Sequence, residues 1–296
     1  MEEAERSGSS APSGDDSVTA RLIVAYEGSG LAGWQRQPNT AETVQQKLEE
    51  ALEALFGQRV VATASGRTDA GVHALGQSVH LCVTSGPSDD EVLRSLVLGA
   101  NAYLPPCIRV LRADRMPEGF HARKHARSKL YRYRWSTSRV IEPQRARYLA
   151  PAPQRLDVAR MRQAAEVLQG RFDFASFARA GGAHQQSVRT VSHVELFERG
   201  DELRLEVRGD GFLRGMVRAI AGTLLEVGTG RRSVEGVEQL LGTESRPAPG
   251  RPAAGPNAPA RGLTLVEVDY EPPWVPVGEG FPRAPDPRAD SDSSTL

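Results

Sequence analysis

One acidic side chain stands in a short polar loop between two apolar runs. Asp69 lies in Ala64-Ser-Gly-Arg-Thr-Asp-Ala-Gly-Val-His-Ala, close to Arg67 and between the strand-like runs 59–64 and 77–84. A nearby arginine favours an ionised carboxylate, as a nucleophile or general base requires. No second carboxylate accompanies Asp69 at helical spacing and no GxSxG motif occurs, so neither a paired-carboxylate nor a Ser-His-Asp hydrolase is favoured. An ordinary polar turn is the structural alternative.

A second chemically distinctive stretch is basic and aromatic. Residues 120–134, FHARKHARSKLYRYR, contain six Arg/Lys and no acid. On a strand, Tyr131, Tyr133 and Trp135 would share one face, and Arg132 and Arg134 the other. Aromatic faces stack on unpaired bases while neighbouring cations bind phosphates, which indicates RNA binding. A half-buried strand with solvent-facing arginines explains the pattern equally well.

A glycine-rich turn resembles a dinucleotide-binding motif only superficially. Gly28-Ser-Gly-Leu-Ala-Gly33 matches GxGxxG after a strand, but Trp34 to Asn39 intervene before any helix. Glu53, at the distance expected for the ribose-binding acid, falls inside the next helix instead of at a strand end. We expect a flexible turn that presents Trp34 and Arg36, and no nucleotide cofactor.

Metal chemistry is also disfavoured. His121 and His125 have the HxxxH spacing of metal ligands, but basic residues surround them and no carboxylate is near. Cys82 and Cys107 are isolated, which excludes a disulfide framework and a zinc ribbon. We expect no metal site.

The elements that must position these residues alternate between strands and helices. Apolar runs predict strands near 21–26, 59–64, 77–84, 107–113, 129–137, 189–198, 202–209 and 263–268. Helical spacing predicts helices near 40–56, 89–99, 156–169, 212–227 and 233–241. The shared rhythm of the two halves suggests two α/β lobes, 18–125 and 126–270, with a Pro/Ala/Gly-rich loop at 242–262 in the second.

The charge is distributed unevenly along the 296 residues. A net charge of zero divides into −4 for residues 1–17, +7 for residues 18–270 and −3 for residues 271–296. The two ends are acidic and polar or Pro-rich, so both are expected to be disordered tails. No apolar run reaches a membrane-spanning length and no secretory signal is evident, so we expect a cytoplasmic protein. The basic body is compatible with a polyanionic partner.

From about residue 21 to 270 the chain resembles the TruA family of bacterial tRNA pseudouridine synthases. The matching motifs are Tyr26-Glu-Gly, Gly33-Trp-Gln-Arg-Gln, Thr43-Val-Gln-Gln-Lys-Leu-Glu, Gly66-Arg-Thr-Asp-Ala-Gly-Val-His-Ala, Asn101-Ala-Tyr-Leu-Pro, Phe120-His-Ala-Arg, Tyr131-Arg-Tyr, Asp173-Phe-Ala-Ser-Phe, Phe212-Leu-Arg-Gly-Met-Val-Arg and Ala258-Pro-Ala-Arg-Gly-Leu. Two features depart from the family pattern: Gly215 stands where the family often has His, and the 242–262 loop is longer than usual.

The resemblance implies an α+β fold in which two related lobes form a continuous, mainly antiparallel sheet flanked by helices, with a basic RNA-binding cleft between the lobes. It implies a homodimer that binds tRNA at the anticodon stem-loop and, without a cofactor, converts uridine to pseudouridine at positions 38, 39 and 40. Asp69 would be the nucleophile and Arg67 a cation beside it. Tyr131 would stack on the target base, and Arg218 would pair with the aspartate.

Three questions stay open at this point. The residues do not decide whether Asp69 attacks C1′ of the ribose or C6 of the uracil. An RNA-binding protein without catalysis would explain the basic and aromatic strand, although binding alone needs no carboxylate facing a polyanion. An enzyme that binds a nucleotide cofactor at Gly28–Gly33 is the third hypothesis.

Overall fold

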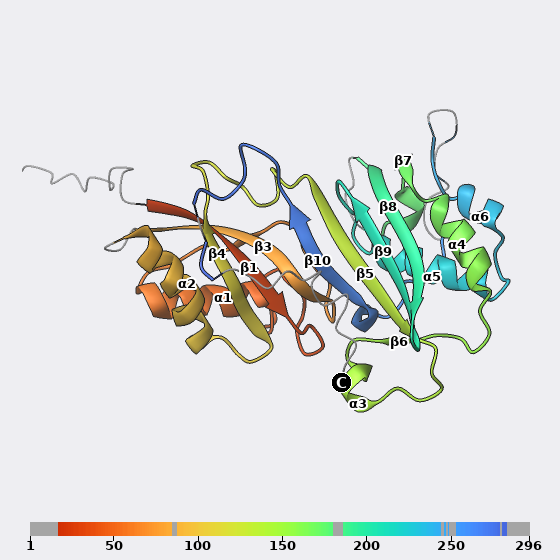
Figure 1. The fold of residues 1–296 in the computed structure, drawn as a ribbon, viewed down its shortest axis with the longest axis horizontal. Helices are drawn as coiled ribbons and strands as arrows, with labels where there is room; N and C mark the ends of the chain where they lie inside the picture. Colours follow the sequence, from red (N-terminus) through yellow and green to blue (C-terminus); the bar gives the residue numbers. More distant parts are fainter. Residues whose placement is uncertain are drawn as a thin grey trace, which may run out of the picture.

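One ten-stranded sheet runs through the molecule, with helices packed against it (Figure 1). The structure is a computed structural model that describes residues 17–84, 88–179, 186–243, 246, 248, 253–278 and 280–282. The strands are β1 (Ser17–Tyr26), β2 (Thr63–Ala64), β3 (His73–Thr84), β4 (Ile108–Arg115), β5 (Ser128–Ser136), β6 (Ala150–Pro151), β7 (Gly170–Asp173), β8 (Val188–Arg199), β9 (Glu202–Gly209) and β10 (Leu263–Asp269). The helices are α1 (Val44–Phe56), α2 (Asp89–Tyr103), α3 (Pro143–Ala146), α4 (Val158–Glu166), α5 (Met216–Gly228) and α6 (Val234–Glu238), with 3₁₀ turns at Ala175–Phe177 and Ala260–Gly262.

The strand order joins segments that are far apart in sequence. The order is β4-β1-β3-β10-β5-β9-β8-β7, with β2 paired to β3 and β6 paired to β5. The β3–β10 and β5–β6 pairs are parallel, and the other pairs are antiparallel. The expected α+β fold with a continuous, mainly antiparallel sheet flanked by helices is therefore confirmed. Strand β10 comes from the end of the fold yet lies between β3 and β5, so it links the strands of the two halves.

Apart from the short α3, the helices form two groups, one toward each end of the sheet (Figure 1). Helices α1 and α2 pack on each other and α2 packs on β4, whereas α4 packs on α5, α6 and β8. Local sequence sets the ends of α1: the Thr43 side chain accepts a hydrogen bond from the Gln46 amide, and Gly57 ends the helix with a left-handed φ of 67°. All five helices predicted from the sequence are present, with shifted ends.

Two of the predicted elements that begin later than expected have a clear local cause. The run 59–64 pairs as a strand only at Thr63–Ala64, because the backbone of Ala62 is bound by side chains of α1. Glu49 accepts from its N–H at 3.1 Å, and Gln45 donates to its carbonyl at 3.2 Å. Helix α5 begins at Met216 instead of 212, because Gly215 has a left-handed φ of 74° and caps the helix.

A row of directly paired residues crosses the five central strands. It runs Tyr26, Ala74, Leu265, Tyr131, Val207, from β1 through β3, β10 and β5 to β9. Every member is buried. Paired residues share a face of the sheet, so the buried face is continuous across both halves, and Tyr131 lies two strands from the beginning of β3.

The aromatic face predicted for β5 belongs mostly to this core. Tyr133 and Trp135 are fully buried, while Arg132 and Arg134 face the other side and pair with Glu206 and Glu202 on β9. The structural alternative is thus correct for most of the strand. Only Tyr131 keeps a small exposed area, 8%.

Part of the segment expected to be an acidic tail from residue 271 packs on the sheet. Val277 donates its amide to the Arg115 carbonyl, and Phe281 forms a two-bond antiparallel bridge with Ala113 beside β4. The Trp274 ring stacks on the His125 ring, with 3.7 Å between the ring centroids. Residues 1–16 and 283–296 lie outside the described residues, so most of both expected tails does too. None of the helices in the described ranges is long and apolar enough to cross a membrane.

Candidate active site

The loop that carries Asp69 connects β2 to β3 and is held by the turn before α1. Trp34 donates its backbone amide to the Thr68 carbonyl at 3.1 Å, and the Leu31 carbonyl accepts from Gly71 at 3.3 Å. A Cβ at Gly28 would lie 2.2 Å from the Val72 carbonyl oxygen, so only glycine fits there. The Gly28–Gly33 turn therefore packs on the Asp69 loop, which accounts for the glycine at position 28.

The expectation that this turn presents Trp34 is wrong. Trp34 is 2% exposed and its ring lies against Tyr26, with 6.3 Å between the ring centroids. A large aromatic residue next to the glycine turn gains more by filling the core beneath the Asp69 loop than by facing water.

A buried amide, Gln77, lies at the centre of a polar network under the loop. It accepts a hydrogen bond from the Ser65 hydroxyl at 2.8 Å and donates to the Gly66 carbonyl at 2.8 Å. The Tyr26 hydroxyl, which lies 3.4 Å from the Gln77 amide nitrogen, also bonds the Thr68 hydroxyl at 2.8 Å. Burial raises the pKa of Tyr26 to about 12, so its phenol stays neutral. These bonds fix the loop at three successive points before Asp69.

Two arginines from the other half of the chain meet Asp69. Arg214 Nε lies 3.5 Å from Oδ1, and Arg218 Nη1 lies 3.6 Å from Oδ2. Arg218 lies in the first turn of α5 and Arg214 directly precedes the Gly215 cap, so both lie at the N-terminal end of this helix. Both distances exceed the roughly 2.7–2.9 Å of a direct charge-assisted hydrogen bond. The guanidinium groups therefore orient the carboxylate while leaving its oxygens free to react.

The two arginines differ in how firmly they are held. The side chain of Arg218 is 17% exposed, that of Arg214 59%. Arg218 Nε donates to the Ala258 carbonyl at 2.8 Å, so the end of the 242–262 loop anchors it. That loop in turn lies directly on α5, where a Cβ at Gly222 would come within 1.8 Å of the Pro256 carbonyl oxygen.

Of the residues proposed from the sequence, the structure brings three together. Asp69 and Arg218 form an ion pair. Tyr131 lies close enough to be affected by Asp69: burial raises the pKa of the Tyr131 phenol most, the neighbouring Tyr26 raises it next, and the Asp69 charge raises it further. Arg67 is exposed, and no hydrogen bond, ion pair or ring contact joins its side chain to any described residue. The charge beside Asp69 comes from Arg214 and Arg218 instead.

Tyr131 forms the aromatic wall of the site. Its ring meets Phe212 edge-on, with 5.1 Å between centroids and 83° between planes. Burial is the largest cause that raises the pKa of its phenol, so the ring is uncharged. No described residue hydrogen-bonds its hydroxyl.

Sequence reasoning missed Arg214, Phe212 and Gln77. Arg214 and Phe212 stand in the string Phe212-Leu-Arg-Gly-Met-Val-Arg218, where a second arginine close in sequence to Arg218 was the available signal. Gln77 gave no signal, because a glutamine at the start of a β-run is not distinguishable from a surface residue.

The two histidines with HxxxH spacing bind backbone amides in the structure. His121 Nδ1 accepts hydrogen bonds from the backbone amides of Arg123 and Lys124, and His125 Nδ1 accepts one from the backbone amide of His121. Within the described ranges no three His, Cys, Asp or Glu residues are grouped to hold a metal ion.

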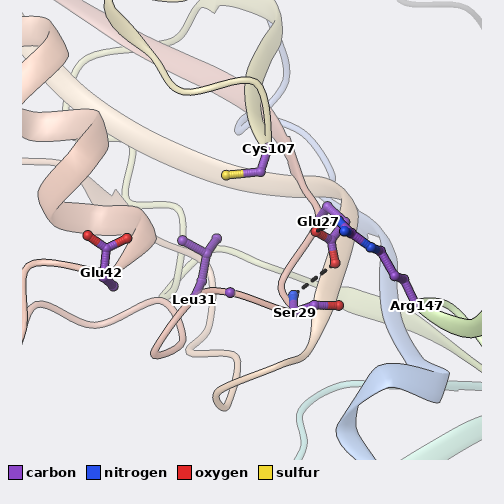
Figure 2. Close-up of a pocket in the computed structure, with 7 residues that line it drawn as sticks. Glu27, Ser29, Leu31, Glu42, Cys107 and Arg147 are labelled. Carbon is purple, nitrogen blue, oxygen red and sulfur yellow. Dashed lines mark hydrogen bonds and ion pairs between the residues drawn. The ribbon is translucent and has the colours of Figure 1, made fainter.

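A surface cavity of about 450 Å³ lies next to the Gly28 turn (Figure 2). Glu27, Glu42, Leu31, Cys107 and Arg147 line it, and the Glu27 carboxylate lies 3.4 Å from Arg147. Two carboxylates and one arginine make this cavity a poor match for a polyanion. Among the described residues, no hydrogen bond or ion pair joins Asp69 to a residue that lines this cavity.

Comparison with known proteins is consistent with these features. The sequence profile of a family described as tRNA pseudouridine synthase matches residues 22–123 and 164–271. A tRNA pseudouridine synthase A from Syntrophotalea carbinolica is 44% identical over 252 residues, covering 85% of this chain and 96% of the relative. Two proteins with the same name are similarly close. The one from Halalkalibacterium halodurans is 45% identical, covering 82% of this chain and 89% of the relative, and the one from Geobacter sulfurreducens is 42% identical, covering 85% of this chain and 99% of the relative.

Proposed function

The chain belongs to the tRNA pseudouridine synthase family, an isomerase family that acts on uridine in tRNA, and we propose that its targets are uridines 38, 39 and 40 of the anticodon stem-loop, with Asp69 as the nucleophile. The observation that carries this proposal is the convergence of Asp69, two arginines and one aromatic ring from both halves of the chain. The stem-loop positions follow from the TruA-like motifs.

The reaction needs one carboxylate that can form and release a covalent bond. The N1–C1′ bond breaks, the uracil turns, C5 bonds to C1′, C5 loses a proton and N1 gains one. There is no net oxidation or hydrolysis. Asp69 attacks either C1′ or C6, and Arg214 and Arg218 hold the carboxylate in place during the attack. The Arg218 guanidinium is preorganised by its hydrogen bond to the Ala258 carbonyl, so it needs little reorganisation when charge moves.

Tyr131 supplies the surface for the extruded base. The target uridine lies in a stem-loop stack and has to leave it, which costs a few kcal/mol. Stacking on an aromatic ring returns about 1–3 kcal/mol. Because the ring is fixed by the sheet and by Phe212, it loses little entropy when the base arrives. Arg67, exposed near Asp69 in the same loop, is suited to bind the RNA backbone beside the base.

The charge of the body supports an RNA partner. Residues 18–270 carry +7, and phosphate neutralisation makes such binding strongly dependent on salt. We place the reaction in the cytoplasm, in a homodimer whose two subunits both contact the tRNA. The chain is expected to work as two lobes, 18–125 and 126–270, with the cleft between them.

The reaction is tested with tRNA transcripts that carry 5-tritiated uridine. Joining C5 to C1′ expels the C5 hydrogen, so release of tritium reports isomerisation directly. The expected result is release from a transcript with uridine at positions 38–40, and none when cytidine replaces those uridines. Equal release from both transcripts would refute the proposed positions. No release from either, with tRNA binding verified, would leave an RNA-binding protein.

A further inference from the structure

Lys129 is a cation beside the Asp69 loop to which no function has been given above. It lies on β5 two residues before Tyr131, so the two side chains share a face, about 7 Å apart along the strand. Its ammonium donates to the Ser65 carbonyl at 2.8 Å. A Cβ at Gly66 would lie 3.2 Å from its Nζ. The ammonium therefore lies against the beginning of the loop that carries Asp69.

Within the described residues, no carboxylate balances the charge of Lys129. No carboxylate of the described ranges lies within the 4.0 Å ion-pair distance of Nζ. Burial, followed by the positive charges of Arg123 and Arg189, lowers the pKa of Lys129 from 10.5 to about 8. A cation that is desolvated and faces two other cations is unfavourable in the free protein.

The two neighbouring arginines are also without carboxylate partners in the part of the chain that the structure describes. The Arg189 guanidinium donates to the carbonyls of Gln186 and Val188. Its Nε would lie 3.3 Å from a Cβ at Gly211, which directly precedes the Phe212 that meets Tyr131. Arg123 is exposed. Three cations thus border the site, and no described acid pairs with any of them.

We propose that Lys129, flanked by Arg123 and Arg189, binds a backbone phosphate of the RNA next to the nucleotide whose base stacks on Tyr131. This inference rests on the proposed function, because it takes the bound polyanion to be the RNA substrate. A phosphate supplies the missing anion and forms charge-assisted hydrogen bonds with the ammonium. Since the same ammonium holds the Ser65 carbonyl, phosphate binding is coupled to the position of the Asp69 loop.

Two other roles for Lys129 predict different behaviour. A purely structural lysine that only supports the Ser65 carbonyl would affect stability and not the salt dependence of RNA binding. A lysine that transfers a proton would affect kcat and its pH profile and leave binding unchanged. The salt dependence of binding therefore separates the phosphate site from both of these roles, and the kcat pH profile separates the two roles from each other.

The first experiment measures the affinity of the full chain for a tRNA transcript between about 50 and 200 mM salt. Lys129→Met should weaken binding and reduce the slope of log K against log salt by about 1, the loss of one phosphate contact. Lys129→Arg should restore the slope. Lys47→Met is the matched control, because Lys47 lies on α1 and pairs with Glu42 at 3.0 Å. An unchanged slope in folded Lys129→Met would overturn the proposal.

A second measurement uses the unmodified protein and so does not depend on the variant folding. The chain has three lysines, Lys47, Lys124 and Lys129, so mass spectrometry after reductive methylation at pH 8 can resolve each. Lys129 should be methylated in the free protein and protected by saturating tRNA, while Lys47 reacts equally in both. A Lys129 that is unreactive in the free protein, or unprotected by tRNA, would contradict a phosphate site.

The same preparations are assayed for tritium release, which keeps the two proposals apart. Wild type that binds tRNA with a Lys129-dependent slope but releases no tritium refutes the proposed function and leaves the phosphate site standing. Wild type that releases tritium with a slope independent of Lys129 does the reverse.

Discussion

Replacing Gln77 with leucine removes the centre of the polar network beneath the Asp69 loop. Leucine has a similar size and no polar atoms, so the change leaves the Gly66 carbonyl without its donor and the Ser65 hydroxyl without its acceptor. Both groups bond to the Gln77 side chain, which is 0% exposed, so water cannot easily replace the lost partner.

The size of the effect follows from the two groups left unpaired. A buried polar group without a partner costs about 1–3 kcal/mol. Gln77→Leu should therefore lower the free energy of unfolding by about 2–6 kcal/mol, a large part of the roughly 5–15 kcal/mol of a typical protein. Ser65→Ala in the Gln77→Leu background removes one of the two orphaned groups. The two substitutions should thus be non-additive by about 1–3 kcal/mol.

The assay is urea unfolding of wild type, the two single variants and the double variant, with single-turnover tritium release on the same samples. Because the amide acts through the loop, the rate should fall while the dissociation constant for tRNA stays within about threefold. Gln46→Leu, on the exposed side of α1 where Gln46 bonds Glu50, should change stability by less than about 0.5 kcal/mol. Additive effects of Gln77→Leu and Ser65→Ala, or wild-type stability of Gln77→Leu, would refute the reasoning.

The remaining predictions concern the site itself. Arg218→Met should slow single-turnover tritium release at least about tenfold more than Arg214→Met. The reason is that the half-buried Arg218 is fixed by the Ala258 carbonyl, whereas the ion pair of the exposed Arg214 with Asp69 is worth only about 0–1 kcal/mol. Equal losses of rate in the two variants would contradict this difference. Tyr131→Ala should lower kcat/KM by about 5- to 150-fold, the equivalent of 1–3 kcal/mol of stacking, whereas Tyr131→Phe should stay within a few-fold of wild type; equal losses would assign the role to the hydroxyl. The pKa of Lys129 is about 8 in the folded chain against 10.5 for a lysine in water, so the unfolded chain binds more protons between these values. The free-energy cost of burying the charged Lys129 ammonium is therefore fully present below pH 8. It disappears as the pH rises toward 10.5, because the lysine is then neutral in both the folded and the unfolded chain. The stability of wild type relative to Lys129→Met, from urea unfolding between about pH 7 and 10, should therefore rise with pH, and a flat difference would refute the shift.

The local parts of the site could be predicted from the sequence. The Asp69 loop lies between two apolar runs, and α1 begins at a Thr43 cap and ends at Gly57, all of which depend on neighbours in the chain. The burial of Tyr133 and Trp135 follows from the same alternation once their face is known to be the core.

The long-range parts could not be predicted from local patterns. Strand β10 brings Leu265 between Ala74 and Tyr131, a pairing that closes loops of well over a hundred residues and leaves no periodic trace. Arg214 reaches Asp69 only because of this arrangement, so the nearer Arg67 was the natural choice from the sequence. Trp34 was misplaced because a residue beside a glycine turn gives no sign of the Asp69 loop that packs over it.

The most direct test of the central claim compares wild type with Asp69→Asn on the same tritiated tRNA. Asparagine keeps the size of the side chain and removes the nucleophilic charge, so the fold and the tRNA affinity should remain. The predicted result is tRNA binding within about threefold of wild type, by the same salt-controlled assay, with no tritium release above background. Tritium release by Asp69→Asn at a rate comparable to wild type would contradict the role of Asp69 as the nucleophile.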